Sequence, residues 1–259
     1  MEEILNLEPR EYQQKIFETA RERNTLVVLP TGLGKTLIAL MLAVDRIKKF
    51  PGKKVLFLAP TRPLAEQHYD YFKKNLPELF ADLQLFTGSV PADKRKKIFQ
   101  TAEIIFSTPQ CIANDLQGNL YDMKEVVLLV IDEAHRCLKN YDYTKVVEHY
   151  KRQAEEQRIL GLTASPGSEI ERVKEICKHL ATDEIEIRNR ESDDVKSYLQ
   201  ELDYDKVSFV HSACLISDPH TTSRKSSTSR PPRPARGRRC TASPSGCPSG
   251  CARRRCVPR

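Results

Sequence analysis

A short loop, Pro-Thr-Gly-Leu-Gly-Lys-Thr at residues 30–36, most constrains how this chain can fold. It follows an apolar run, Leu26–Leu29, that is typical of a buried strand, and it opens a stretch with apolar residues at helical spacing. A glycine-rich loop between a strand and a helix surrounds an anionic phosphate with backbone N–H groups and the N-terminus of the helix. In such a loop Lys35 reaches the β- and γ-phosphates, and the hydroxyl of Thr36 binds Mg²⁺. The strand-loop-helix context supports this interpretation, although Leu29 stands where the full pattern has its first glycine.

A pair of carboxylates, Asp132 and Glu133, ends a second buried run, Val126–Ile131. Every residue of that run is apolar, as in a strand that is covered on both faces. The carboxyl end of a strand in an open α/β sheet is where a Mg²⁺ ligand and a water-activating base belong. The alternative is a glycine-rich turn and an acidic loop that bind no ligand.

Residues 1–187 alternate short apolar runs with segments of helical periodicity. Such alternation is typical of βαβ units, in which a parallel sheet has helices on both faces. We therefore expect an α/β fold with three layers, α/β/α, and a mostly parallel sheet. The predicted strands are Leu26–Leu29, Val55–Leu58, Leu83–Thr87, Ile104–Ser107, Val126–Ile131, Arg158–Leu162 and Glu184–Ile187.

The C-terminal part of the chain has a different composition. From Asp218 onward there are ten Arg, one Lys and one acidic residue, so residues 1–217 carry 31 basic and 34 acidic side chains. The formal net charge of +7 thus belongs to the tail and does not indicate that the body binds nucleic acid. The tail is rich in Arg, Pro, Ser and Cys, and it cannot bury enough surface to offset its ordering entropy. We predict a folded domain at 1–205 and a disordered tail at 206–259.

The N-terminus and the cysteines indicate the cellular setting. The N-terminus has no basic or apolar signal region, and the longest apolar runs are far too short to cross a bilayer. We expect a cytoplasmic protein with no membrane partner and with reduced cysteines. The last four cysteines of the tail contain no C-x₂-C pair, and this spacing does not favour zinc; they are Cys240, Cys247, Cys251 and Cys256.

Further short motifs follow the predicted strands in order along the chain. They are Arg10–Gln13 before the phosphate loop, then Ala59–Leu64, Thr87–Gly88, Ser107–Gln110 and Leu162–Pro166. With the phrases PTGLGKT, APTRPLAEQH, STPQCIANDL, DEAHRC and LGLTASPG, the chain over about residues 8–205 resembles the first RecA-like, ATP-binding domain of superfamily 2 DEAH-box helicases. It is most similar to the group of the archaeal Hef helicase/nuclease and its Fanconi-type M relatives, near the RIG-I-like and Dicer helicases.

The resemblance implies ATP and Mg²⁺ as cofactors and assigns residues to them. Gln13 would hydrogen-bond the adenine edge, with Arg10 nearby in support. The phosphates and Mg²⁺ would be held by Thr31, Gly32, Gly34, Lys35 and Thr36, with Asp132 as a second Mg²⁺ ligand. The catalytic residues would be Lys35, Asp132, Glu133 and His135, among which Glu133 would orient and deprotonate the attacking water.

The resemblance also implies residues for nucleic acid and for coupling. Thr163 and Ser165 would link hydrolysis to strand movement. The nucleic-acid groove would be lined by Thr61, Arg62, Thr87, Gly88, Thr108 and Pro109. Hydroxyl and backbone N–H groups contact phosphate and sugar, so binding there would be largely independent of base sequence.

Several of these segments have simpler interpretations. One simpler interpretation of Arg10–Gln13 is that these residues start a helix and have no contact with nucleotide. The threonines could be helix N-caps or turn residues, namely Thr61 and Thr108 as caps, and Thr163 with Ser165 as a turn before Pro166. The run Lys94–Lys97 is interpreted as a solvated helix face. Three histidines have no partner at ligand spacing and are interpreted as structural or exposed: His68, His149 and His179.

By resemblance, the function would be that of an ATP-dependent, DNA-directed helicase with branched or forked DNA as its substrate, and we expect a monomer. Two other functions stay open. One is a non-enzymatic module that binds ATP or nucleic acid and uses the Arg-rich tail as an electrostatic anchor. The other is an RNA-directed ATPase of the RIG-I-like or DEAH type, since we identify no decisive reader of the 2′-hydroxyl.

Nothing after residue 205 resembles the second RecA-like domain of such helicases. From about residue 208 the Arg/Pro/Ser/Cys-rich string is typical of a shifted, GC-rich reading frame, so we expect an out-of-frame or truncated sequence there. A chain without the second domain should hydrolyse ATP poorly, because the arginine finger of that domain contributes ~10³–10⁵ in rate.

Overall fold

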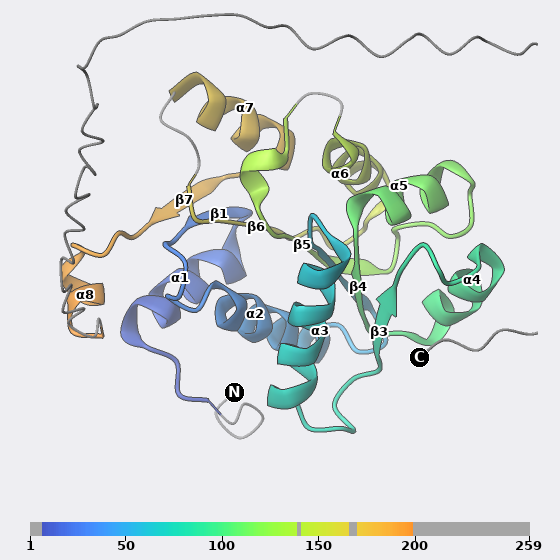
Figure 1. The fold of residues 1–259 in the computed structure, drawn as a ribbon, viewed down its shortest axis with the longest axis horizontal. Helices are drawn as coiled ribbons and strands as arrows, with labels where there is room; N and C mark the ends of the chain where they lie inside the picture. The colour runs from blue at the N-terminus through green and yellow to red at the C-terminus, as the bar shows by residue number, and fades with distance from the viewer. Residues whose placement is uncertain (1–6, 139–140, 166–169, 199–259) are drawn as a thin grey trace, which may run out of the picture. The chain divides into compact units, whose positions relative to one another are not determined.

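The computed structural model describes residues 7–138, 141–165 and 170–198, along which strands and helices alternate (Figure 1). The strands are β1 (Thr25–Val28), β2 (Lys54–Leu58), β3 (Leu83–Phe86), β4 (Ile104–Ser107), β5 (Val126–Ile131), β6 (Ile159–Thr163) and β7 (Glu184–Ile187). The helices are α1 (Glu11–Glu22), α2 (Lys35–Lys49), α3 (Arg62–Asn75), α4 (Ala92–Thr101), α5 (Pro109–Gln117), α6 (Asp142–Gln153), α7 (Ile170–Leu180) and α8 (Asp193–Lys196), with a 3₁₀ turn η1 (Ala134–Arg136). The predicted tail, 206–259, and all the cysteines in it lie outside the described residues.

The seven strands form one parallel sheet in the order β3-β4-β2-β5-β6-β1-β7. The predicted parallel sheet is confirmed, and each strand begins and ends within one residue of its predicted bounds. β5, whose residues are all apolar, lies in the middle of the order and is buried along its whole length.

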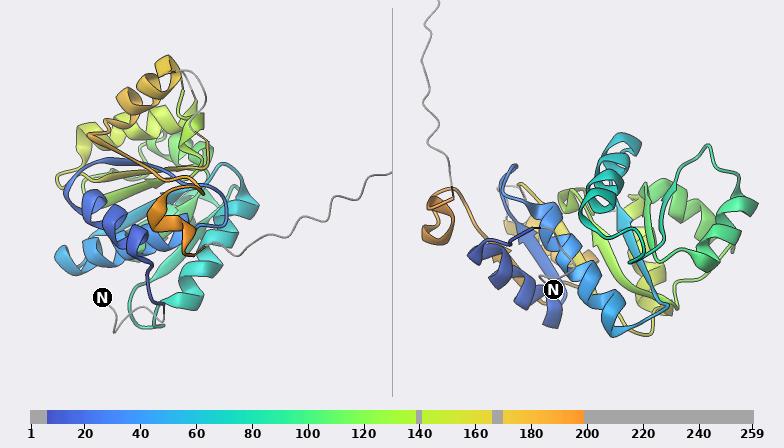
Figure 2. Two further views of the ribbon diagram at one scale, coloured as in Figure 1. Left: turned by 90° about the vertical axis from the view of Figure 1, so that its left-hand side faces the viewer. Right: turned by 90° about the horizontal axis from the view of Figure 1, so that it is seen from below.

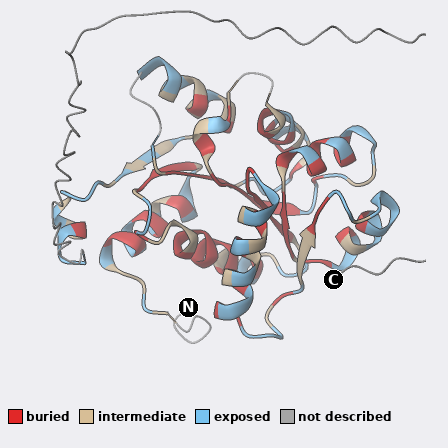
Figure 3. Ribbon diagram, viewed as in Figure 1, coloured by how far each residue is buried: buried red, intermediate tan, exposed pale blue. Residues whose placement is uncertain are grey.

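Helices cover both faces of the sheet, which confirms the three-layer prediction. α1, α2 and α3 pack on one face, and α5, α6 and α7 pack on the other (Figures 1 and 2). Buried residues lie along the sheet and on the helix faces turned toward it, whereas the outer helix faces are exposed (Figure 3). Each face of the sheet therefore has its own hydrophobic core.

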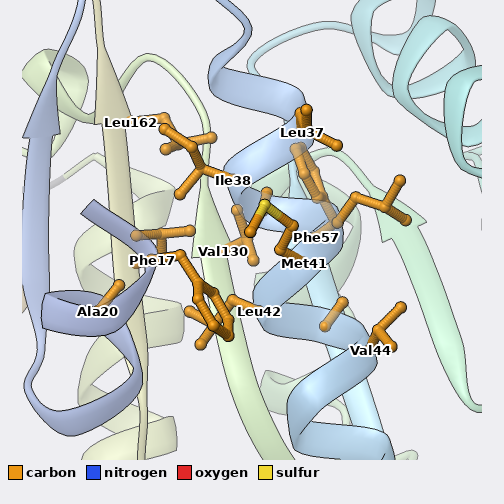
Figure 4. Close-up of a cluster of buried hydrophobic side chains, with 14 of the residues drawn as sticks. Phe17, Ala20, Leu37, Ile38, Met41, Leu42, Val44, Phe57, Val130 and Leu162 are labelled. Carbon is orange, nitrogen blue, oxygen red and sulfur yellow. The ribbon is translucent and has the colours of Figure 1, made fainter. Parts of the chain in front are cut away.

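α2 is buried on nearly all sides. Every residue from Leu37 to Val44 is buried, as is typical of a helix that other elements enclose. Ile38 and Met41 belong to one cluster with Val130 of β5 and Leu162 of β6 (Figure 4). Because the phosphate loop leads directly into α2, this packing holds the loop at the carboxyl edge of the sheet.

The strand order divides the carboxyl edge into two neighbouring halves. The ends of β3, β4 and β2 carry the residues predicted to contact nucleic acid. In the other half, the ends of β5 and β1 carry residues predicted to contact ATP and Mg²⁺, and the end of β6 between them carries the residues predicted for coupling. Strand pairing continues to the edge in both halves, since Ala59 N donates to Ser107 O and Leu29 N donates to Thr163 O, each over 3.0 Å. The two predicted sites therefore lie side by side and meet between β2 and β5.

Two short elements, η1 and α8, are not predicted from the sequence because they are too short to show a periodic pattern. α8 packs against α1, and its Val195 is fully buried. The chain after β7 thus returns to the N-terminal helix. Across the described residues, no helix has both the length and the apolar composition that a membrane span requires.

Candidate functional site

The phosphate loop passes twice through the left-handed backbone region. Gly32 has a φ of +88° and Gly34 has a φ of +77°, conformations that favour glycine. α2 begins at Lys35, directly after the second glycine, so the unpaired N–H groups of its first turn lie next to the loop. Thr31 and Gly32 are exposed. Backbone donors and the positive end of a helix thus come together as in an anion site.

α1 lies against the loop through two side chains. The Tyr12 hydroxyl donates to Leu33 O over 2.8 Å, and Gln13 Nε2 donates to Leu33 O over 3.2 Å and to Gly34 O over 3.5 Å. Gln13 Oε1 accepts a hydrogen bond from Arg10 N over 2.9 Å and so caps α1. Arg10–Gln13 therefore starts a helix, as the simpler interpretation predicts, and also joins that helix to the phosphate loop.

The two glycines of the loop allow a prediction that separates the cost of left-handed backbone strain from the loss of the hydrogen bonds made by Gln13. A Cβ at Gly34 would lie 2.3 Å from Gln13 Nε2, whereas a Cβ at Gly32 would have no atom within 4 Å. Gly34→Ala should therefore lower the free energy of unfolding by about 1–3 kcal/mol more than Gly32→Ala, because it also breaks the Gln13 hydrogen bonds. Both variants carry the left-handed strain, so Gly32→Ala is the control. Urea unfolding measures the difference, and equal losses would contradict the Gln13 contact.

Lys35 is held inside the loop. Its Nζ donates to Leu29 O over 2.8 Å. Burial lowers the pKa of the Lys35 ammonium, while the negative charges of Glu133 and Asp132 act in the opposite direction. A phosphate that enters the loop would add negative charge beside a partly desolvated cation, which is the interaction predicted for Lys35.

One imidazole lies between the two predicted Mg²⁺ ligands. His68 Nε2 is 3.0 Å from Asp132 Oδ2, and His68 Nδ1 is 3.4 Å from Thr36 Oγ1. His68 is buried, and its ring lies on Phe57 with a centroid distance of 4.5 Å. Of the two sequence interpretations of His68, structural or exposed, the exposed one is therefore wrong. The partners of His68 are distant in the sequence, because α3 follows β2, which is the neighbour of β5 in the sheet.

Asp132 and Glu133 lie where β5 ends. Asp132 N donates to Leu58 O over 2.8 Å, which continues the pairing with β2. The Tyr143 hydroxyl donates to Asp132 O over 2.8 Å, and burial raises the pKa of Tyr143, so that the hydroxyl stays a neutral donor. Glu133 has a φ of +51°, which is strained for a residue with a side chain. The turn that follows directs the chain away from the sheet at once.

His135 connects the acidic motif to β6. Its Nδ1 is 3.2 Å from Glu133 Oε2 and 3.1 Å from Thr163 Oγ1. Thr163 is fully buried, its Oγ1 donates to Ser165 O over 3.1 Å, and Ser165 N donates to Thr163 Oγ1 over 3.2 Å. The residues predicted to couple hydrolysis to movement thus touch the predicted catalytic residues, and the turn of the simpler interpretation is also present.

The residues predicted for nucleic acid differ in exposure. Thr61, Arg62 and Gly88 are exposed, Thr108 is half-buried, and Thr87 and Pro109 are buried. Thr61 and Thr108 occupy the N-cap positions of α3 and α5, yet neither side chain makes a capping hydrogen bond. Arg62 Nε donates to Glu66 Oε1 over 2.7 Å on the surface of α3. Along the described chain, no hydrogen bond or ion pair joins these six side chains to those predicted to bind ATP.

A buried ion pair supports this half of the edge. Arg95 lies within the run Lys94–Lys97, and the prediction of a solvated face is wrong for Arg95, which is buried while the three lysines are exposed. Arg95 Nε donates to Asp115 Oδ2 over 2.7 Å, and the guanidinium also donates to Val90 O. The Tyr121 hydroxyl donates to Asp115 Oδ2 over 2.9 Å. These bonds tie α4 to α5 and to the loop after β3.

The oxygen atoms of Thr36 and Asp132 fit a Mg²⁺ ion. Mg²⁺ prefers oxygen ligands and is commonly held by one or two carboxylates together with substrate phosphates. Among the described residues, no group of three or more His, Cys, Asp or Glu side chains could hold a metal ion by itself. The pair is therefore suited to a cation that takes its other ligands from phosphate and water.

The sequence profile of the DEAD/DEAH box helicases matches residues 10–173, more than half of the chain. The chain belongs to the DEAD/DEAH box helicase family. The matched range runs from the first residue before α1 into α7, and it includes every residue predicted for ATP, Mg²⁺, nucleic acid and coupling.

Relatives of this DEAD/DEAH box helicase chain come from fungi, archaea and animals. The ATP-dependent DNA helicase mph1 of Neurospora crassa is 41% identical over 206 residues, which are 79% of this chain and 18% of that protein. The putative ATP-dependent RNA helicase MJ1505 of Methanocaldococcus jannaschii is 42% identical over 193 residues, 74% of this chain and 24% of that protein. The Fanconi anemia group M protein homolog of Mus musculus is 39% identical over 204 residues, 78% of this chain and 10% of that protein.

A solved structure agrees with these relatives. The Hef helicase domain of Pyrococcus furiosus matches with a TM-score of 0.75 and 42% identity, over 78% of this chain and 43% of that one. The predicted resemblance to the Hef and Fanconi-type M group is confirmed. The chain spans about a tenth to a quarter of the length of the curated relatives named above.

Sequence reasoning missed two residues at this helicase site, His68 and Tyr143. Both contact Asp132, from α3 and α6 respectively. The available signal was a polar group on a helix face that also carries apolar residues, but its partner depends on which strands are neighbours. Local periodicity does not determine the order of strands in a sheet. The contacts of His68 and Tyr143 with Asp132 can therefore be identified only from the folded structure.

Proposed function

We propose that this chain binds ATP and Mg²⁺ between the phosphate loop and the Asp-Glu-Ala-His motif, as the ATP-binding domain of a DNA-directed superfamily 2 helicase. The observation that carries the proposal is a path of side-chain contacts across the edge of the sheet. It runs from Gln13 to the loop, from Thr36 through His68 to Asp132, and from Glu133 through His135 to β6.

The residues of this path have distinct tasks in the proposal. The loop N–H groups and Lys35 hold the phosphates. Gln13 contacts the base, and its hydrogen bonds to Leu33 O and Gly34 O link base binding to the loop. Mg²⁺, when bound, neutralises charge that develops on the phosphates. Glu133 orients the attacking water and takes its proton. His135 contacts both Glu133 and Thr163, so a change at the γ-phosphate reaches the end of β6.

The neighbouring half of the edge is the proposed nucleic-acid surface. Exposed hydroxyl, backbone and guanidinium groups there suit phosphate and sugar, which carry little sequence information. We propose branched or forked DNA as the substrate. Relatives whose names describe DNA helicases, in Neurospora crassa and in Schizosaccharomyces pombe, support DNA, although a Methanocaldococcus jannaschii relative is named an RNA helicase. The branched or forked form rests on the resemblance to the Hef and Fanconi-type M group.

Equilibrium binding by the full chain tests this proposal. A fluorescent, non-hydrolysable ATP analogue should bind in the presence of Mg²⁺ and more weakly in EDTA. With the analogue present, unlabelled forked DNA should displace a labelled fork at lower concentration than linear duplex DNA or RNA of equal length. Anisotropy measures both steps.

The other functions give different results in the same assay. RNA that competes as well as forked DNA would favour an RNA-directed ATPase. DNA binding that falls steeply with salt and disappears when residues 217–259 are removed would favour a non-enzymatic module with a basic anchor. No binding of the analogue under any condition would contradict the nucleotide site itself.

A further inference from the structure

His68 is the side chain that physically joins the two halves of the predicted metal site. It lies on α3, two turns after the residues predicted to contact nucleic acid, and is only 8% exposed. Its two ring nitrogens contact Asp132 Oδ2 and Thr36 Oγ1, at 3.0 Å and 3.4 Å. The two partners come from opposite ends of the ATP half of the edge, β5 and the loop after β1.

The chemistry of the three groups gives the direction of both hydrogen bonds for a neutral imidazole. An ionised carboxylate can only accept, so Nε2 carries the proton that points to Asp132. In the neutral ring Nδ1 is then an acceptor, and the Thr36 hydroxyl donates to it. A hydroxyl that gives its proton to Nδ1 turns its lone pairs away from the ring. The carboxylate likewise keeps its other oxygen, Oδ1, for a further partner.

We propose that His68 is a positioning residue that orients Thr36 and Asp132 toward the divalent cation of a bound nucleotide. This inference rests on the proposed function, because it concerns the same Mg²⁺–ATP site. Residues that orient metal ligands commonly act through one hydrogen bond to each ligand, and their loss typically costs 10–100-fold in metal affinity or activity. His68 supplies such a bond to both protein ligands at once.

If His68 served only to fill space in the core, it would need no polar atoms. The ring lies on Phe57 at a centroid distance of 4.5 Å, and Phe57 packs with Phe72 and Phe106. An apolar side chain of similar size could fill that place. Only a side chain with two polar atoms can hydrogen-bond the hydroxyl and the carboxylate at the same time.

The test compares nucleotide affinity with and without the cation in the full chain. A fluorescent, non-hydrolysable ATP analogue is titrated in EDTA and in saturating Mg²⁺, and the ratio of the two affinities is recorded. For His68→Leu the ratio should fall by about 10–100-fold, while the affinity in EDTA stays near that of the wild type. His68→Gln keeps a donor and an acceptor and should retain most of the ratio. His149→Leu, the same substitution on α6, should leave it unchanged.

The outcomes separate this inference from the proposed function. A wild-type chain whose affinity does not depend on Mg²⁺ would overturn the proposed site as a whole. A wild type that depends on Mg²⁺, with a folded His68→Leu variant of equal ratio, would overturn the role of His68 alone.

A second measurement needs no destabilising variant. In the wild-type chain with ¹⁵N-labelled histidine, adding Mg²⁺ to the nucleotide complex should shift the ring resonances of His68 and leave those of His149 unchanged. The His68→Gln variant assigns the resonance. A His68 ring that does not respond to Mg²⁺ would overturn the proposal even if His68→Leu fails to fold.

Discussion

Lys35→Ala is expected to weaken the binding of ATP and Mg²⁺ by about 10- to 150-fold. A hydrogen bond to a charged group contributes about 1.5–3 kcal/mol, and the Lys35 ammonium is the cation that the loop presents to the phosphates. Removing it should disturb the fold little, because its hydrogen bond is to a single loop carbonyl, Leu29 O. Titration with a fluorescent ATP analogue measures the change.

Lys48→Ala provides the matched control for this prediction. Lys48 lies on the same helix, at the opposite end, and is exposed. It should bind the analogue as the wild type does. If Lys35→Ala were folded and bound with unchanged affinity, the loop would not be the phosphate site.

Asp115→Ala is expected to lower the free energy of unfolding by about 3–5 kcal/mol, which is the usual cost of leaving one member of a buried ion pair alone. The side chain of Asp115 is 2% exposed and that of Arg95 is 10% exposed. The substitution would leave the Arg95 guanidinium without its carboxylate partner, and it would also remove the acceptor of the Tyr121 hydroxyl. Urea unfolding followed by circular dichroism measures the loss.

The surface pair of Arg62 and Glu66 provides the comparison. Its side chains are 59% and 39% exposed, and an exposed pair at this spacing on a helix contributes about 0.3–0.5 kcal/mol. Glu66→Ala should therefore cost little. The double variant Arg95→Met/Asp115→Leu should recover much of the stability lost in Asp115→Ala, since it leaves no unpaired charge. A cost for Asp115→Ala no larger than that for Glu66→Ala would show that the pair is not buried in solution.

Local patterns in the sequence were sufficient for the sheet and for the phosphate loop. β5 could be predicted because all its residues are apolar, and the loop because two glycines and a lysine stand between a strand and a helix. The resemblance added the residues at the other strand ends. All these signals lie within a few consecutive residues.

The contacts that sequence reasoning missed all depend on which elements are neighbours. His68 meets Asp132 because β2 lies beside β5, and Arg95 meets Asp115 because β3, which precedes α4, lies beside β4, which precedes α5. The run Lys94–Lys97 also shows how a charge run can mislead. Three of its four residues are exposed, whereas Arg95 is buried because it pairs with Asp115, 20 residues further along the chain. Periodicity cannot supply partners at such separations.

The place of β1 in the sheet sets the order in which a nascent chain can build its phosphate site. Within the described part of the chain, the partners of β1 are β6 and β7, and Thr25 lies opposite Leu160 and Glu184, which follow it by 135 and 159 residues. At about 5–20 residues per second, a ribosome needs roughly 7–27 s to make the first of these partners after Thr25. Until then the apolar strand and the helix behind it have no sheet edge to join. A nascent chain that stalls before residue 159 therefore exposes this apolar segment to chaperones and to other chains. Nucleotide cannot stabilise such a chain, because its phosphate site has not yet formed.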